Sequence, residues 1–277
     1  MKFIMFTKHL QGLEIPELVD ALASVGVGGA DLCVRPGYPV HPENVEQALP
    51  QAAAQFAAAG MSIPLVTTPG DFIRPELDYA ERLYAACAEA GVENIKLGYW
   101  HWSPECDYWK EVDQIRGYLD GFAELSDKYG VRTCIHNHSG FCLGLNASSA
   151  MHLVAGHDPR CIGVFADPGH LSIVGEPIEL ALDIVRRYLA VVAFKDLVRQ
   201  RTVQDGQVVW KTRVVRLGQG FADYAAVLRG LERIGFDGPV SFHSEYSGEP
   251  VASVIDLARV DVRYINELIE DLQSSSA

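Results

Sequence analysis

One unit recurs along the chain: a helical stretch ends in glycine and is followed within a few residues by a short apolar run. The glycines of five such units are Gly26, Gly60, Gly91, Gly130 and Gly235. Glycine ends many helices because it adopts the left-handed backbone conformation without a clash at Cβ. The spacing is about 30 to 40 residues, with one gap of about three units, so two units lack the glycine. This repeat predicts alternating helices and strands.

Eight apolar runs occupy the strand positions of the repeat. They are residues 2–6, 30–34, 62–66, 94–99, 131–136, 162–166, 191–194 and 239–242. Several are almost continuously apolar, as expected of parallel strands that are buried on both faces. Eight strand–helix units predict an α/β fold, a single (β/α)8 TIM barrel. An open doubly wound sheet is the alternative, but no glycine-rich phosphate loop follows Phe6.

No linker-like stretch divides the chain, so we expect one barrel over residues 1–273 and a frayed tail at 274–277. Pro50, inside a helical stretch at 43–59, predicts a kink or two shorter helices. The polar segment 199–216 is poor in strand signals and too long for a routine connection. Such long loops are often lids.

Charge and apolar pattern limit the partners. The chain has 277 residues, with 23 Lys plus Arg against 36 Asp plus Glu, for a formal net charge of −13. The longest basic run is Arg186-Arg187, so we expect neither a nucleic-acid partner nor a membrane surface. No apolar run is long enough for a membrane span or a signal peptide, and no cysteines show Cys-x-x-Cys spacing. We expect a cytoplasmic protein that acts on a small molecule.

Reactive side chains gather where the predicted strands end, in segments 96–102, 136–140, 167–170, 195–196 and 243–246. Barrel chemistry takes place at the carboxyl ends of the strands. Because side chains alternate along a strand, His136 and His138 point the same way, as do His243 and Glu245. Imidazoles and carboxylates that converge there predict a divalent-metal site. A mixed nitrogen and oxygen set suits Mn²⁺, Fe²⁺, Co²⁺ or Zn²⁺ better than Ca²⁺.

Each of these features also has an ordinary structural explanation. A histidine pair at a strand end could hydrogen-bond neighbouring loops, and segment 167–170 could be a turn, because Asp, Pro and Gly favour turns. The Lys195-Asp196 pair could be a surface ion pair. The aromatic run 99–102 could stack on a sugar ring or pack under a loop. The argument for a site depends on all of these features meeting at one rim.

These residues resemble the xylose-isomerase-like barrel superfamily, which includes sugar-phosphate isomerases and epimerases, inosose dehydratase and endonuclease IV. The most specific pieces are the segments 136–138, 167–170, 195–196, 217–220 and 238–245. The resemblance implies a carbohydrate substrate and, because such barrels often pair, a homodimer. The endonuclease activity is disfavoured because a chain with a net charge of −13 repels phosphate backbones.

The metal ligands that the resemblance implies are only partly present. Family members typically bind one divalent metal through Glu, Asp, His and Glu on strands five to eight. Those positions fall on His136, Asp167, Ala193 and His243, with Glu245 two residues later. Three explanations stay open: a rearranged ligand set that also draws on His138 and Glu245, acid–base chemistry by Lys195 and the histidines without metal, or a barrel that only binds a ligand.

We favour a retained enzyme, because polar side chains pointing into a barrel mouth cost stability unless they are satisfied. The resemblance implies proton transfer next to a carbonyl, as in an isomerase or epimerase of a sugar or keto-sugar. If a leaving group adjoins the same enolate, the result is a dehydratase or lyase acting on a keto-sugar or cyclitol. A non-catalytic sugar-binding barrel is the remaining alternative.

The site residues in this interpretation fall into three groups. The catalytic group is Lys195, Glu245, His138 and His170, the substrate-binding group is Trp100, His101, Asn137 and Asp196, and the metal group is His136, Asp167 and His243. Lys195 or a metal would stabilise the enediolate oxygen. Glu245 or His243 would be the base, with His138 or His170 as its partner.

Overall fold

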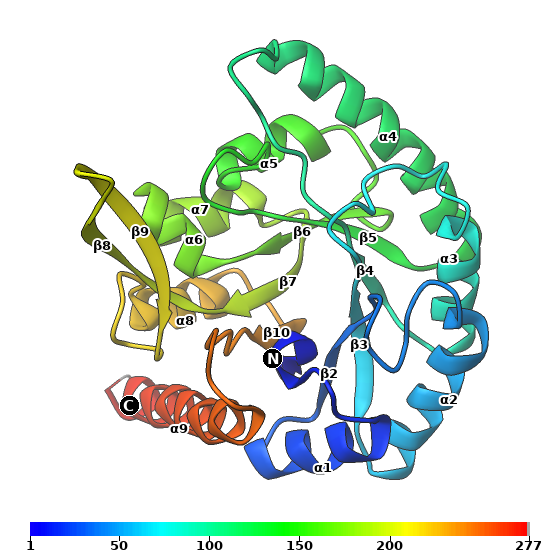
Figure 1. Ribbon diagram of the computed structural model, residues 1–277, viewed down its shortest axis with the longest axis horizontal. Helices are drawn as coiled ribbons and strands as arrows, with labels where there is room; N and C mark the ends of the chain where they lie inside the picture. The colour runs from blue at the N-terminus through cyan, green and yellow to red at the C-terminus, as the bar shows by residue number, and fades with distance from the viewer. Residues whose placement is uncertain (276–277) are drawn as a thin grey trace.

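Eight parallel strands close into a barrel in the computed structural model, which describes residues 1–275 (Figure 1). The barrel strands are β1 (Lys2–Phe6), β2 (Gly29–Cys33), β3 (Ser62–Thr67), β4 (Asn94–Lys96), β5 (Arg132–His136), β6 (Ile162–Ala166), β7 (Leu189–Phe194) and β10 (Pro239–Phe242). Their order around the barrel is β1-β10-β7-β6-β5-β4-β3-β2. The predicted TIM barrel is confirmed, and every predicted strand overlaps one barrel strand.

Helices surround the barrel on its outer side (Figure 1). They are α1 (Ile15–Val25), α2 (Val45–Ala58), α3 (Ala80–Glu89), α4 (Tyr108–Tyr129), α5 (Ala147–Val154), α6 (Pro168–Val174), α7 (Ile178–Val185), α8 (Tyr224–Arg233) and α9 (Val251–Ser275), with a 3₁₀ helix η1 (Thr7–Leu10) after β1. Gly26 ends α1 with φ of 90°, and its N–H donates to the carbonyls of Leu22 and Ala23. Among residues 1–275, no helix has both the length and the apolar character to cross a bilayer.

Two sequence predictions about helices differ from the structure, one of them in part. Pro50 lies inside the single helix α2, so the alternative of two shorter helices is wrong, and Leu49 and Ala52 beside it are buried in the core. Tertiary packing of this kind sustains helices that local propensity alone would break. Ser274 and Ser275 are helical rather than frayed, since their hydroxyls donate to the carbonyls one turn earlier. The rest of the predicted tail, residues 276–277, lies outside the described residues.

The segment predicted to be a strand-poor loop is a β-hairpin, so that prediction was wrong. Strands β8 (Asp196–Gln204) and β9 (Gln207–Val215) pair with each other and project away from the barrel (Figure 1). The turn residues Asp205 and Gly206 both have positive φ, as a tight hairpin turn requires. Most hairpin side chains are at least partly exposed, so no apolar run indicated the strands. The Asp-Gly pair was the available signal.

An apolar layer fills the barrel interior beneath the carboxyl ends of the strands. Its interior positions hold Ile4, Leu65, Cys134, Phe165, Val191 and Ala193, and Ala190 belongs to the same buried cluster. Because side chains alternate, the residue two positions later along a strand faces the same interior, one layer closer to the carboxyl end. Cys134 is thus followed by His136, Phe165 by Asp167, and Ala193 by Lys195. The polar side chains at the rim therefore lie above this apolar layer.

Candidate active site

A cavity of about 90 Å³ opens at the carboxyl end of the barrel. Its lining residues are Phe6, Lys8, Arg35, Thr67, Lys96, Tyr99, His136, His138, Lys195, His243 and Glu245. Water occupies about 30 Å³ per molecule in the liquid, so this cavity has room for about three waters. It fits the reacting end of a small molecule, with the remainder of that molecule outside. Five of the eleven predicted site residues line the cavity: His136, His138, Lys195, His243 and Glu245.

Lys195, the residue after β7, joins two carboxylates. Its Nζ lies 2.9 Å from Glu245 Oε2 and 3.3 Å from Asp167 Oδ2, and its side chain is 5% exposed. Burial lowers the pKa of Lys195, but the two carboxylates outweigh burial and raise it to about 12. Burial likewise acts to raise the pKa of Asp167, yet Lys195 and the nearby imidazoles hold it well below its usual range. Lys195 and Asp167 thus each favour the charged form of the other.

Glu245, three residues after β10, also binds a second lysine. Lys8 Nζ donates to Glu245 Oε1 at 2.8 Å, while His243 Nδ1 lies 3.7 Å from Glu245 Oε2. Burial opposes ionisation of Glu245, but Lys195 and His243 hold its pKa well below the usual range. A carboxylate this strongly held is a weak base. Its geometry suits it to orient Lys8 and Lys195 in the cavity.

His136, the last residue of β5, links Tyr99 to Asp167. Its Nε2 lies 3.2 Å from Asp167 Oδ2, and its Nδ1 lies 2.8 Å from the Tyr99 hydroxyl. The ionised Asp167 can only accept, so Nε2 carries the proton and Nδ1 accepts from the Tyr99 hydroxyl. Burial lowers the pKa of His136 well below its ordinary value. His136 is thus a neutral imidazole in a fixed orientation.

His138 presents an unprotonated nitrogen. Its Nδ1 lies 2.9 Å from the carbonyl oxygen of Ser139, which only accepts, so Nδ1 carries the proton. Burial and then Lys195 lower the pKa of His138 to about 4, which leaves the ring neutral with a lone pair on Nε2. His170 lies behind it, with ring centroids 3.9 Å apart, and is held by Ser139 Oγ at 2.8 Å. His138 lines the cavity and His170 does not.

His243, which follows β10, is held against a buried carboxylate of β2. Its Nε2 lies 3.3 Å from Asp31 Oδ2, and Asp31 also accepts from Thr67 Oγ1 at 2.6 Å and Ser241 Oγ at 3.0 Å. Burial lowers the pKa of His243, but the contacts with Asp31 and Glu245 outweigh burial and raise it. The pKa of His243 is therefore shifted upward, opposite to the shift of His138.

Two predicted substrate residues instead hold the backbone around the site. Asn137 Oδ1 accepts from the Asp167 N–H at 2.7 Å. The fully buried Asp196 accepts from the backbone N–H groups of Leu197, Gly218, Gly220 and Ala222. The Asp196 carboxylate oxygens therefore accept hydrogen bonds mainly from the loop after β9. We assign Asn137 and Asp196 a structural part, because neither lines the cavity.

The other two predicted substrate residues lie away from the cavity. Trp100 is 8% exposed and packs in the hydrophobic core. His101 is exposed and forms an isolated bridge with Cys142. The aromatic residue of this segment that does line the cavity is Tyr99. The interpretation of the run as packing under a loop therefore holds for Trp100.

Sequence reasoning gave no role to four charged residues of the site: Lys8, Asp31, Arg35 and Lys96. Asp31 lies in a strand whose five residues are all buried. An acidic residue in an otherwise apolar strand indicates a buried, paired carboxylate, so the sequence did carry a signal for Asp31. Lys96 ends β4 and is 2% exposed. Lys8 lies two residues beyond β1, in η1, and nothing in the local sequence distinguishes it from a surface lysine.

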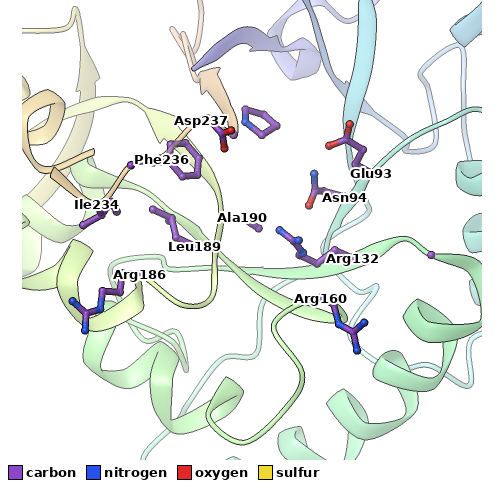
Figure 2. Close-up of a pocket in the computed structure, with 14 residues that line it drawn as sticks. Glu93, Asn94, Arg132, Arg160, Arg186, Leu189, Ala190, Ile234, Phe236 and Asp237 are labelled. Carbon is purple, nitrogen blue, oxygen red and sulfur yellow. The ribbon is translucent and has the colours of Figure 1, made fainter. Parts of the chain in front are cut away.

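A larger hollow of about 480 Å³ lies at the opposite end of the barrel, where strands begin. Figure 2 shows Arg186 on the opposite side of this hollow from Arg132 and Arg160, so the three guanidinium groups do not converge. Arg160 and Arg186 are paired with Asp158 and Asp183. Barrel chemistry belongs to the carboxyl end, so we assign the candidate site to the smaller cavity.

The donor set at the carboxyl end does not fit a divalent metal. Among residues 1–275, no group of three or more His, Cys, Asp or Glu side chains is arranged to hold an ion. The Lys195 ammonium lies between Asp167 and Glu245, and Ala193 offers no donor. His136 and His243, the other predicted ligands, face Asp167 and Asp31. The predicted Mn, Co, Fe or Zn cofactor therefore lacks a suitable ligand set here.

Comparison with known proteins identifies a family and several relatives. A model of the xylose isomerase-like TIM barrel family matches residues 19–268. The chain is 25% identical over 171 residues to an inosose dehydratase of Lactiplantibacillus plantarum, covering 58% of this chain and 56% of the relative. It is 21% identical over 155 residues to an uncharacterised protein of Methanocaldococcus jannaschii, covering 55% and 50%. The chain thus matches about half the length of these curated relatives.

Solved structures share the fold along nearly the whole chain. A D-tagatose 3-epimerase-like protein superposes with a TM-score of 0.76 at 18% identity and covers 100% of both chains. D-psicose 3-epimerase of Clostridium cellulolyticum, solved with D-tagatose, gives 0.73 at 13% identity, covering 97% of this chain and 99% of that one. The IolI protein with a bound zinc atom gives 0.73 at 18% identity, covering 96% and 98%. At these identities the similarity shows the fold.

Proposed function

Because the chain belongs to the xylose isomerase-like TIM barrel family, we propose that it is an isomerase or epimerase that moves a proton next to the carbonyl group of a sugar or keto-sugar. One observation carries the proposal. Lys195 Nζ, fixed between Asp167 and Glu245, lines the same small cavity as His138 and His243. A cation can stabilise an enediolate, and two imidazoles whose pKa values are shifted in opposite directions can remove and return its proton.

Lys195 supplies the charge for the intermediate. Removing the proton next to a carbonyl places negative charge on the carbonyl oxygen, and a fixed, buried ammonium stabilises that charge. Asp167 and Glu245 keep Lys195 protonated and fix its position. This corresponds to the metal-free explanation left open by the sequence.

His138 and His243 are suited to opposite halves of the proton transfer. His138 Nε2 carries a lone pair and can take the proton, whereas His243, whose pKa is raised, holds a proton more firmly than His138 and can return one. The ring centroids of His138 and His243 lie 6.3 Å and 5.7 Å from that of His136. Removal by one imidazole and return by the other gives epimerisation or isomerisation, depending on which carbon receives the proton.

Dehydration of a keto-sugar or cyclitol is a second candidate, favoured by the similarity to an inosose dehydratase. The same enediolate would expel a hydroxyl from the next carbon if a protonated group lies beside it. His243 could protonate that hydroxyl as it leaves. The two reactions differ in their products, so one assay separates them.

The test is a product screen by NMR with a panel of ketoses and ketocyclitols. We expect an interconverted ketose, and Lys195→Met should reduce turnover by at least ~100-fold, the usual effect of removing one charge-stabilising group. Lys110→Met is the matched control because Lys110 is exposed on α4, and it should retain full activity. An unsaturated product would establish the dehydratase. No turnover of any panel member by the wild type would overturn the proposed function.

A further inference from the structure

Lys96 is a cavity lysine that the proton transfer described above does not use. It is the last residue of β4, its side chain is 2% exposed, and it lines the cavity together with His136, Lys195 and Glu245. A lysine is among the residues least often fully buried unless it is paired. Its placement beside the proposed reacting groups therefore calls for a chemical role.

Lys96 and Lys195 have different surroundings in the same cavity. Lys195 Nζ is bound by two carboxylates, whereas among residues 1–275 no carboxylate forms an ion pair with Lys96 Nζ. Lys96 Nζ lies over the Tyr99 ring instead, 3.6 Å from its centroid. An ion-paired ammonium has no lone pair to offer. Of the two lysines, Lys96 is the one placed to act as an amine.

Electrostatics agree with this geometry. Burial is the largest cause that lowers the pKa of Lys96 well below its ordinary value, and the cations of Arg35 and Lys195 lower it further. Asp31 and Glu245 act in the opposite direction without outweighing these causes. A lysine desolvated beside other cations is a recognised way to make a nucleophilic amine. The Tyr99 ring contact favours the ammonium form, but it is a smaller effect than full burial.

We propose that Lys96 binds the carbonyl carbon of the substrate covalently, as an imine, an inference that rests on the keto-sugar reaction proposed above. The small cavity brings a carbonyl to Lys96 because it admits only the reacting end of a substrate. The ligand class is therefore an aldehyde or ketone with a hydroxyl-bearing carbon next to the carbonyl.

The step conserves atoms and electrons. The Nζ lone pair adds to the carbonyl carbon, the C=O π pair moves to oxygen, where the Lys195 ammonium stabilises the charge, and a proton passes from nitrogen to that oxygen. Loss of one water gives the C=N bond, so amine plus ketone yields imine plus water with no oxidant or reductant. The protonated imine acidifies the neighbouring C–H, whose proton His138 Nε2 takes. Return of the proton and hydrolysis by water restore the amine.

The experiment traps the imine by reduction on the full-length protein. Wild-type protein is incubated with dihydroxyacetone, a ketone small enough for the cavity, and treated with sodium borohydride. We expect a mass increase equal to dihydroxyacetone less one oxygen atom, located by peptide mapping on Lys96. No adduct on Lys96, or equal labelling of the exposed Lys110, would overturn the inference.

A matched variant and a second measurement control for misfolding. Lys96→Arg keeps a cation but forms no imine, so it should show the wild-type circular dichroism spectrum and no adduct. In H₂¹⁸O the wild type alone should speed oxygen exchange into dihydroxyacetone by about tenfold or more, since each imine cycle exchanges the carbonyl oxygen. If the wild-type protein leaves oxygen exchange into dihydroxyacetone at its uncatalysed rate, the imine is contradicted. This result does not depend on the folding of any variant.

The two proposals can fail separately. Ketose turnover by the wild type without a trapped adduct or oxygen exchange would overturn the imine and leave the proposed function standing. An adduct on Lys96 without turnover of any ketose or ketocyclitol would support the imine and overturn the proposed function.

Discussion

Lys195 Nζ lies 2.9 Å from Glu245 Oε2, so an ammonium group is hydrogen-bonded to a carboxylate at the mouth of the barrel. The same nitrogen is 3.3 Å from Asp167 Oδ2. Lysine thereby supplies the positive charge between these two carboxylates. The candidate chemistry of this chain follows from this position of the Lys195 ammonium, because a fixed ammonium can stabilise an enediolate oxygen.

Lys195→Met should cost both stability and activity. Asp167 is fully buried and would lose its closest cation, and removing one partner of a buried ion pair typically costs about 3–5 kcal/mol. Urea unfolding measures the loss of stability. The double variant Lys195→Met with Glu245→Gln should recover part of the stability but none of the turnover. Equal stability of wild type and Lys195→Met would show that this pairing is not formed.

Stability should fall in acid because of Glu245. Its pKa is held well below the ordinary value of 4.5, so its contribution is fully present above pH 4.5 and is lost as the pH falls through the lower folded-state value. In Glu245→Gln that contribution is missing at every pH. The difference in free energy of unfolding between wild type and variant should therefore shrink as the pH drops below 4.5. A constant difference down to acid unfolding would count against the ion pairs of Glu245.

Chelation should leave the protein unchanged if Lys195 takes the place of a metal. We expect elemental analysis of protein purified without chelator to show far less than one divalent metal per chain. Treatment with EDTA should shift neither Tm nor ketose turnover. Turnover lost on EDTA treatment and restored by Mn²⁺, Co²⁺ or Zn²⁺ would contradict the account of the donor set.

Asp196 should prove important for stability rather than for chemistry. Its carboxylate accepts backbone N–H groups from the loop after β9, and a Cβ on Gly220 would lie 2.1 Å from Asp196 Oδ1. Asp196→Ala leaves buried donors unsatisfied, which costs about 1–3 kcal/mol for each such group. Thermal unfolding measures the effect, with the exposed Asp237→Ala as control. A larger loss of kcat than of stability would instead place Asp196 at the substrate.

The sequence predicted the barrel well because its signals are local. Helix-ending glycines and short buried strands depend on a few neighbouring residues, and strand alternation placed His136 and Lys195 at the rim. The pairings were harder to predict because they join distant segments: Lys8 with Glu245, and Asp31 with His243. Nothing local distinguishes such residues from their surroundings until the barrel closes.

The most direct test is deuterium incorporation from D₂O during ketose turnover by protein depleted of metal. The account predicts deuterium at the carbon next to the carbonyl, at a rate that Lys195→Met lowers by at least ~100-fold. Two results would contradict a proton transfer supported by Lys195. One is a ketose that carries no deuterium after turnover, and the other is deuterium incorporation that appears only after a divalent metal is added.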